Sequence, residues 1–159
     1  MRKQLFAIAS ILAALSGHPG EAAAQSDPSC TYDACAVRFD YAFFGGQHLV
    51  RGVAAERIAT LSPFSNAVRE ALAGTDSSNV YAATFQEKYR WGTAMAAAGA
   101  IIGTVPILLQ GDDFSDVDIA FTITGYGIAL VGGWLITSGM DDLNRAIWWY
   151  NRQFSGSAE

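Results

Sequence analysis

Two long apolar stretches, Trp91–Leu109 and Ile119–Thr137, dominate the second half of the chain. Neither contains Asp, Glu, Lys, Arg or His, and each is about as long as a helix must be to cross a bilayer. A short acidic connection, 110–118, separates them. We therefore predict a helical membrane hairpin over 79–140, with its first helix beginning near Asn79 and ending near Leu109.

Small residues recur along one face of each predicted helix. Their spacing of three or four residues keeps them on one side of a helix. In lipid, such residues let two backbones approach closely, so that van der Waals packing holds the helices together. The predicted helix-packing residues are Gly92, Ala96, Gly99 and Gly103 in the first helix and Gly125, Ala129, Gly133 and Thr137 in the second. The alternative is that these are ordinary Gly and Ala of apolar helices without a packing role.

Opposite charges meet at one end of the hairpin if its turn lies near Phe114. The expected approaches are of Lys88 and Arg90 to Asp141 and Asp142, and of Glu87 to Arg145. Exposed pairs of this kind add little stability individually, but their match supports the antiparallel arrangement.

The segment 141–154 has the pattern of an amphipathic helix, because Leu143, Ile147, Tyr150 and Phe154 share one face. It either lies at the membrane interface or continues the second span. Aromatic residues also gather near this end of the hairpin and predict an interfacial belt: Phe85, Tyr89, Trp91, Trp134, Trp148, Trp149 and Tyr150. We expect the last residues, 155–159, to form a disordered tail.

The N-terminus has the pattern of an export signal. Basic residues at 2–3 precede the apolar run Leu5–Leu15, and Ala22 and Ala24 match the small-residue cleavage rule. We predict a cleaved signal peptide at 1–24, with an uncleaved anchor as the alternative.

Residues 25–78 are predicted to form a small exported α+β head. Export to an oxidising compartment favours a disulfide between Cys30 and Cys35. A redox or metal pair is the alternative, although four intervening residues do not match the usual motifs. Alternation after Cys35 predicts a β-hairpin over 36–52, a short helix is expected near 66–73, and Val53–Leu61 is compatible with strand or helix. The fold class is thus mainly α, a two-helix apolar (transmembrane) hairpin with a small N-terminal α+β head.

The expected topology conflicts with the positive-inside rule. A cleaved signal places both Gln25 and the C-terminus outside and the acidic connection in the cytoplasm, so that the basic residues near the hairpin lie outside. Either the signal peptide sets the topology regardless, or the leader is retained with both ends cytoplasmic, or the hairpin does not span. We favour the first, which gives a membrane protein with its head in the periplasm or cell exterior.

Charge and residue inventory exclude several functions. The chain has a formal net charge of −5 and no basic cluster, which argues against nucleic acid as a partner. His48 is the one histidine beyond the leader, too little for a histidine-based metal site or triad. The aspartates of 110–118 fit a solvated turn better than a Ca²⁺ loop. The apolar stretches lack the ionisable groups of ion-coupled transporters. We expect no catalytic, metal or cofactor-binding residues, and no cofactor.

Three motifs together resemble uncharacterised exported bacterial proteins. They are Cys30-x4-Cys35 with the following Ala-Val-Arg-Phe, the segment Leu49–Gly52 and the closing segment Ala146–Asn151. The resemblance implies a bacterial source, and with it the bacterial inner membrane as the location, and brings no known activity. The leading hypothesis is a non-enzymatic envelope membrane protein that works in the lipid by self-association or by contact with an envelope partner. The alternatives are a pore or membrane-active oligomer with a threonine-lined path, and, third, a redox-active protein using its cysteine pair.

Overall fold

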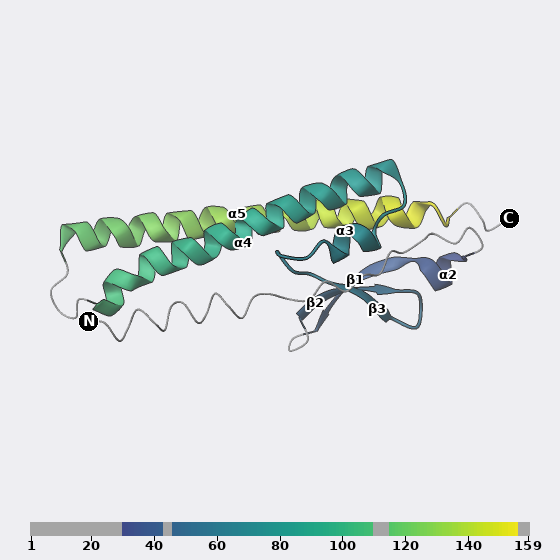
Figure 1. Cartoon of the computed structure of the whole chain (residues 1–159), viewed down its shortest axis with the longest axis horizontal. Helices are drawn as coiled ribbons and strands as arrows, with labels where there is room; N and C mark the ends of the chain where they lie inside the picture. The colour runs from purple at the N-terminus through teal and green to yellow at the C-terminus, as the bar shows by residue number, and fades with distance from the viewer. Residues whose placement is uncertain (1–29, 43–45, 110–114, 156–159) are drawn as a thin grey trace.

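The computed structural model describes residues 30–42, 46–109 and 115–155. The predicted signal peptide, the turn of the β-hairpin at 43–45, most of the acidic connection and the end of the tail lie outside these residues. The described elements are α2 (Tyr32–Cys35), β1 (Val37–Ala42), β2 (Gly46–Arg51), β3 (Glu56–Thr60), α3 (Ala67–Ala71), α4 (Asp76–Leu109) and α5 (Asp116–Arg152). The fold is mainly helical, as expected, with two long apolar helices and a small sheet (Figure 1).

Local hydrogen bonds define where the long helices begin. The Ser78 amide donates to the Thr75 hydroxyl, and the Thr75 amide donates to the Ser78 hydroxyl, so that α4 begins at Asp76, three residues before the predicted start. Ser115 forms a capping box with Asp118 at the start of α5. The two helices run past the apolar stretches at the head end, and α5 continues to Arg152. The segment 141–154 is therefore mostly a continuation of α5 rather than a separate helix.

Three antiparallel strands in the order β1-β2-β3 form the sheet of the head. The predicted β-hairpin is confirmed, with Val37 opposite Arg51 and Ala42 opposite Gly46. The ambiguous segment after it forms β3, with a bulge between Leu49 and Val50 in its pairing to β2. The strand places Ala59 in the core, and this burial decides between the two expectations for a short segment.

The sheet and α3 pack against the head-end halves of α4 and α5 (Figure 1). Leu49 and Leu72 of the head are fully buried against helix residues that include Phe85, Leu143 and Tyr150. The amphipathic face predicted for 141–154 thus supports the head, with Leu143, Tyr150 and Phe154 buried and Ile147 packed at the edge. A head this small needs such outside surface to bury an adequate core.

The side chain of Asn151 joins α5 to the sheet. Its Nδ2 donates to the Val37 carbonyl and its Oδ1 accepts from the Val37 amide, both at 2.7 Å. One carboxamide thereby satisfies both peptide groups of an edge residue, as a neighbouring strand would.

Replacing Phe85 tests whether the helices supply the core of the head. Phe85 is 1% exposed, so Phe85→Ala should lower the free energy of unfolding by about 3–5 kcal/mol. Val80→Ala is the matched control on the same helix, because Val80 is 63% exposed and should change stability by less than about 0.5 kcal/mol. Denaturant titration in detergent, followed by near-UV circular dichroism, measures both. Equal effects would contradict a shared core.

Candidate functional site

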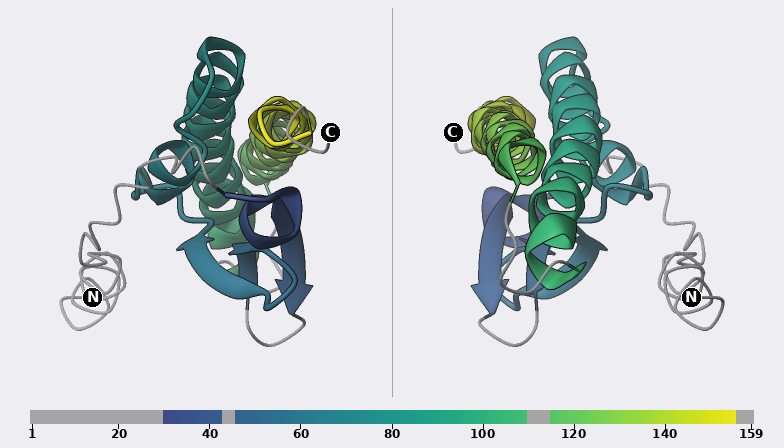
Figure 2. Two further views of the ribbon diagram at one scale, coloured as in Figure 1. Left: turned by 90° about the vertical axis from the view of Figure 1, so that its right-hand side faces the viewer. Right: turned by 90° about the vertical axis from the view of Figure 1, so that its left-hand side faces the viewer.

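The two long helices pack backbone to backbone at a set of glycines. A Cβ at Gly92 would lie 2.8 Å from the Gly132 carbonyl oxygen, and one at Gly132 would lie 2.6 Å from that of Gly92. Gly99 meets Gly125 in the same way, with 2.5 Å between its added Cβ and the Gly125 carbonyl oxygen. No side chain larger than hydrogen fits at these positions without moving the helices apart. Figure 2 shows the two helices crossing side by side along this contact.

All four small residues predicted in α4 lie at this interface. Gly99 and Gly103 adjoin Gly125, and the backbones of Gly92 and Ala96 adjoin Gly132. The spacing along this helix alternates between four and three residues, which averages to the 3.5-residue period of a left-handed helix pair.

In α5 the packing face differs from the predicted one. Gly125 and Ala129 contact α4, but an added Cβ at Gly133 would meet nothing within 4 Å, and Thr137 is exposed. The prediction failed because a strict four-residue step advances about 40° around a helix each time, so that Gly133 has already left the contact face. The observed face continues through Gly132 instead.

Glycines at intervals of seven residues form the true face of α5. Gly125, Gly132 and Gly139 are buried, and Ala146 continues the series into the head. The sequence contained this signal, because a seven-residue repeat of small residues indicates a helix pair with a 3.5-residue period. Gly132 and Gly139, together with Asn151, are the residues that sequence reasoning missed.

A partly buried ion pair marks the head end of the glycine contact. Lys88 Nζ lies 2.7 Å from Asp142 Oδ2 and donates to Ser138 Oγ at 3.0 Å. The side chain of Asp142 is 11% exposed and that of Lys88 32%. Gly139 permits the approach, because an added Cβ there would lie 3.3 Å from Lys88 Cβ. The predicted antiparallel register of the hairpin is therefore confirmed for the contact between Lys88 and Asp142.

The contacts predicted for Arg90 and Arg145 with acidic side chains are not formed, and both arginines have other partners. Arg90 donates to the Pro63 carbonyl at 3.1 Å instead of meeting an aspartate, and Asp141 is exposed. Arg145 lies over the Tyr81 ring at 5.8 Å rather than beside Glu87. The head, which the register argument did not include, supplies partners to these groups.

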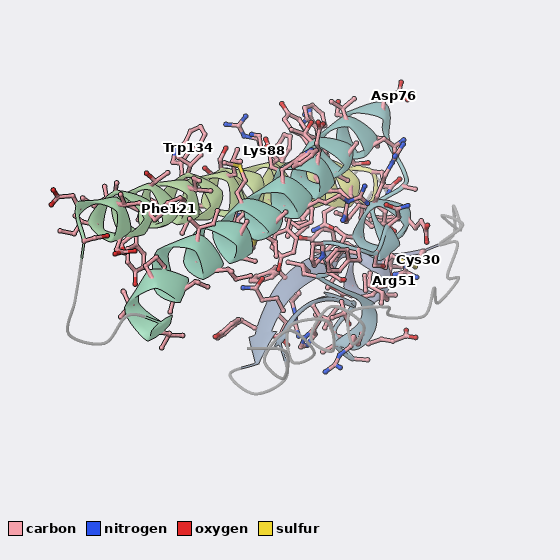
Figure 3. The ribbon with its side chains drawn as sticks, turned by 60° about the vertical axis from the view of Figure 1, so that its left-hand side comes forward. Cys30, Arg51, Asp76, Lys88, Phe121 and Trp134 are labelled. Carbon is pink, nitrogen blue, oxygen red and sulfur yellow. A yellow bond between two sulfur atoms is a disulfide. The ribbon has the colours of Figure 1, made fainter. Side chains whose placement is uncertain are left out.

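The predicted aromatic belt separates into two groups. Trp91 and Trp134 are 61% and 67% exposed, and Trp134 projects away from the hairpin (Figure 3). Phe85 and Tyr150 are instead core residues. Tyr89 packs on Phe85 with 5.3 Å between ring centroids, and desolvation by burial raises the pKa of its hydroxyl above the usual 10, so that it stays neutral. Trp148 and Trp149 lie near the C-terminal end of α5, close to Arg152.

Cys30 and Cys35 form the predicted disulfide, which encloses α2 with 5.9 Å between the two Cα atoms. Both cysteines pack against the core of the head. Among the described residues, no group of three or more His, Cys, Asp and Glu side chains is placed to hold a metal ion. The assembled features are thus a helix-packing surface and a disulfide-bridged head.

Comparison with protein-family models, with curated proteins and with solved structures finds no match for the chain.

The neighbouring glycines of α5 give a direct test of the packing face. Gly132→Leu should lower the free energy of unfolding of the helix pair by about 1–3 kcal/mol, because the added side chain meets the α4 backbone. Gly133→Leu should leave it nearly unchanged, since the same side chain enters open space. Titration with a denaturing detergent, followed by helix content, compares the two. A larger loss of stability from Gly133→Leu would show that the predicted face with four-residue spacing packs on α4 after all.

A double-mutant cycle tests the ion pair. Lys88→Met should cost about 1.5–3 kcal/mol, because it leaves the Asp142 carboxylate without its charged hydrogen-bond donor. Adding Asp142→Leu should recover part of that loss, since no uncompensated charge then remains. Additive single effects would show that the two side chains are energetically independent.

Proposed function

We propose that the protein is a non-enzymatic, two-span membrane protein of the bacterial envelope. The hairpin of α4 and α5 crosses the inner membrane and holds the head at its outer surface. The protein works by self-association or by contact with an envelope partner. The observation that carries this proposal is the distribution of exposed apolar side chains.

Most of the large apolar side chains that the described residues expose lie on the half of the hairpin away from the head. They are Trp91, Ile101, Ile102, Val105, Ile107, Leu108, Val117, Ile119, Phe121, Ile123, Tyr126, Leu130, Val131 and Trp134. The protein itself buries 17% and 11% of the most apolar windows of α4 and α5. The core helices of soluble proteins are mostly buried by their own fold, so that this surface calls for lipid.

The dimensions of the uncovered half suit a bilayer. From Trp91 to Leu109 the helix rises about 27 Å, close to the roughly 30 Å of a hydrocarbon core. Trp91 and Trp134 stand at the head-side limit of this span, where interfacial tryptophans are expected. Lys88 and Asp142 lie just beyond it, with their charges paired.

The orientation follows from the leader. A cleaved signal peptide at 1–24 delivers the head to the periplasm or cell exterior, and the disulfide suits that oxidising compartment. The connection between α4 and α5 then faces the cytoplasm.

Contact is favoured over catalysis because the exported part of the sequence offers few catalytic groups. His48 is its one histidine, and the side chain that pairs with it, Asp40, lies 3.7 Å away. A surface for self-association remains on α5, because Gly127 and Gly133 face open space away from α4.

A pore lined by Thr93, Thr104, Thr122 and Thr124 receives less support. Thr122 and Thr124 are two residues apart and project from nearly opposite sides of α5. Thr93 donates its hydroxyl hydrogen bond to the Tyr89 carbonyl of its own helix at 2.7 Å. One hairpin therefore does not present these hydroxyls as a single stripe.

Membrane integration is tested by a matched pair of arginine substitutions. Leu130→Arg places a charge near the middle of the proposed span, where insertion costs about 2.5–3.5 kcal/mol, and should move the protein into the carbonate-extractable fraction. Val80→Arg, at a head-end position that is 63% exposed against 75% for Leu130, should leave it in the membrane. If both variants stay in the membrane as the parent does, the lipid-facing assignment is wrong.

Reporter fusions at position 114 and after the C-terminus test the orientation. We expect cytoplasmic activity for the first and periplasmic activity for the second. A periplasmic reporter at position 114 would reverse the proposed topology.

A further inference from the structure

One edge of the sheet has peptide groups that face away from any strand. The Gly52 amide donates to the Ala36 carbonyl at 2.8 Å, which sets the alternation of the β1–β2 ladder. The peptide groups of Val37, Phe39 and Tyr41 consequently point to the opposite side. The strand order β1-β2-β3 leaves this side of β1 without a described strand.

Asn151 already takes the place of a strand at the first of these residues. Its carboxamide holds both the amide and the carbonyl of Val37. Among the described residues, no side chain does the same for Phe39 or Tyr41, and Tyr41 is 59% exposed. At this edge, the peptide groups of Val37 are hydrogen-bonded to Asn151 of α5. The outward peptide groups of Phe39 and Tyr41 follow along β1 without such a partner among the described residues.

A groove lies over the first residues of β1, with α2 and the turn after β2 on one side and one face of α5 on the other. Its volume is about 580 Å³. Its walls are Val37, Arg38 and Phe39 of β1, Asn144, Ile147 and Asn151 of α5, and Tyr32, Asp33, Ala36, Gly52 and Val53 on the opposite side. The three residues of α5 recur at intervals of three and four, so that they form one face of the helix toward the strand.

We propose that the free edge of β1, which meets the groove on the side toward α5, binds an extended segment of another polypeptide, which adds to β1 as a fourth strand. The inference deepens the proposed contact with an envelope partner and rests on it. In an added antiparallel strand, the residue opposite Phe39 projects to the same side as Phe39, toward Ile147, and is apolar. The residue opposite Arg38 projects to the other side and is acidic.

Charge supports this assignment. Arg38 is exposed at the groove and, among the described residues, has no carboxylate within ion-pair distance, whereas Asp40 lies 3.7 Å from His48. Opposite charges on directly facing strand residues are favourable, and an acidic residue would supply the missing partner to Arg38.

The test uses the full mature chain in lipid nanodiscs and a fluorescent, N-acetylated peptide, Ser-Val-Lys-Val-Glu-Ser. Antiparallel addition places its second valine opposite Phe39 and its glutamate opposite Arg38. We expect saturable binding by fluorescence anisotropy and slower hydrogen exchange at the amides of Phe39 and Tyr41. Methylating the backbone nitrogen of the second valine removes one ladder hydrogen bond and should weaken binding about tenfold.

Variants of the edge separate the backbone contribution from the charge contribution. Tyr41→Pro removes an outward amide without breaking the β1–β2 ladder and should weaken binding as the methylated peptide does, whereas Tyr41→Ala keeps the amide and should bind. Arg38→Glu should prefer a peptide with lysine in place of glutamate.

Several results would overturn the inference: no binding of the peptide to the parent protein, equal binding of the methylated peptide, or pairing of two copies through β1. The nanodisc preparation and the reporter fusions report membrane insertion independently. A protein that inserts with the expected topology but binds no peptide refutes the added strand alone, whereas a protein that does not insert refutes the proposed function itself.

Discussion

The close approach of α4 and α5 is the contact on which the rest of the structure depends. Gly92, Gly99, Gly125 and Gly132 place backbone against backbone, so that the crossing of the helices is fixed by main-chain atoms rather than by adaptable side chains. In lipid there is no hydrophobic gain from bringing two apolar helices together, and packing of this kind is the main attraction available. The same contact fixes the register that brings Lys88 to Asp142 and sets the positions from which both helices continue into the head.

Along the hairpin, the packing residues change from small to large toward the head. The seven-residue series of α5 passes from Gly125 and Gly132 to Ala146, and its neighbouring face ends in Leu143 and Tyr150. Outside the membrane, burying large apolar side chains is strongly favourable, at about 25 cal/mol per Å² of apolar surface. The head therefore packs by the hydrophobic effect on the same two helices that pack through glycine farther from it. One continuous pair of helices thus changes the size of its packing residues without changing its period.

The sequence predicted those parts of the fold that depend on local pattern. Alternation after Cys35 indicated the β-hairpin, the apolar stretches indicated the two long helices, and antiparallel register predicted the meeting of Lys88 with Asp142. The packing face of α5 was predicted only in its first half, because a four-residue step and a 3.5-residue period agree over one turn and diverge over three. The positions of Phe85 and Asn151 could not be predicted from local pattern, since each is set by the sheet that folds back on the helices. Their hydrophobicity or polarity is compatible with an interface as well as with a core.

Because the head packs directly on the helices, a partner that binds the head would also contact α5. The free edge of β1 is anchored to α5 through Asn151, and the groove beside it is walled by Asn144 and Ile147 of the same helix. Farther from Asn151, α5 carries Asp142 and then Gly139, where an added Cβ would lie 3.3 Å from Lys88 Cβ of α4. A strand added at the edge would thus contact the helix that also carries the glycine contact with α4, with no flexible linker between them. Any displacement of α5 by such a strand would be passed along a rigid helix to the glycine contact, which tolerates little change because its atoms are backbone.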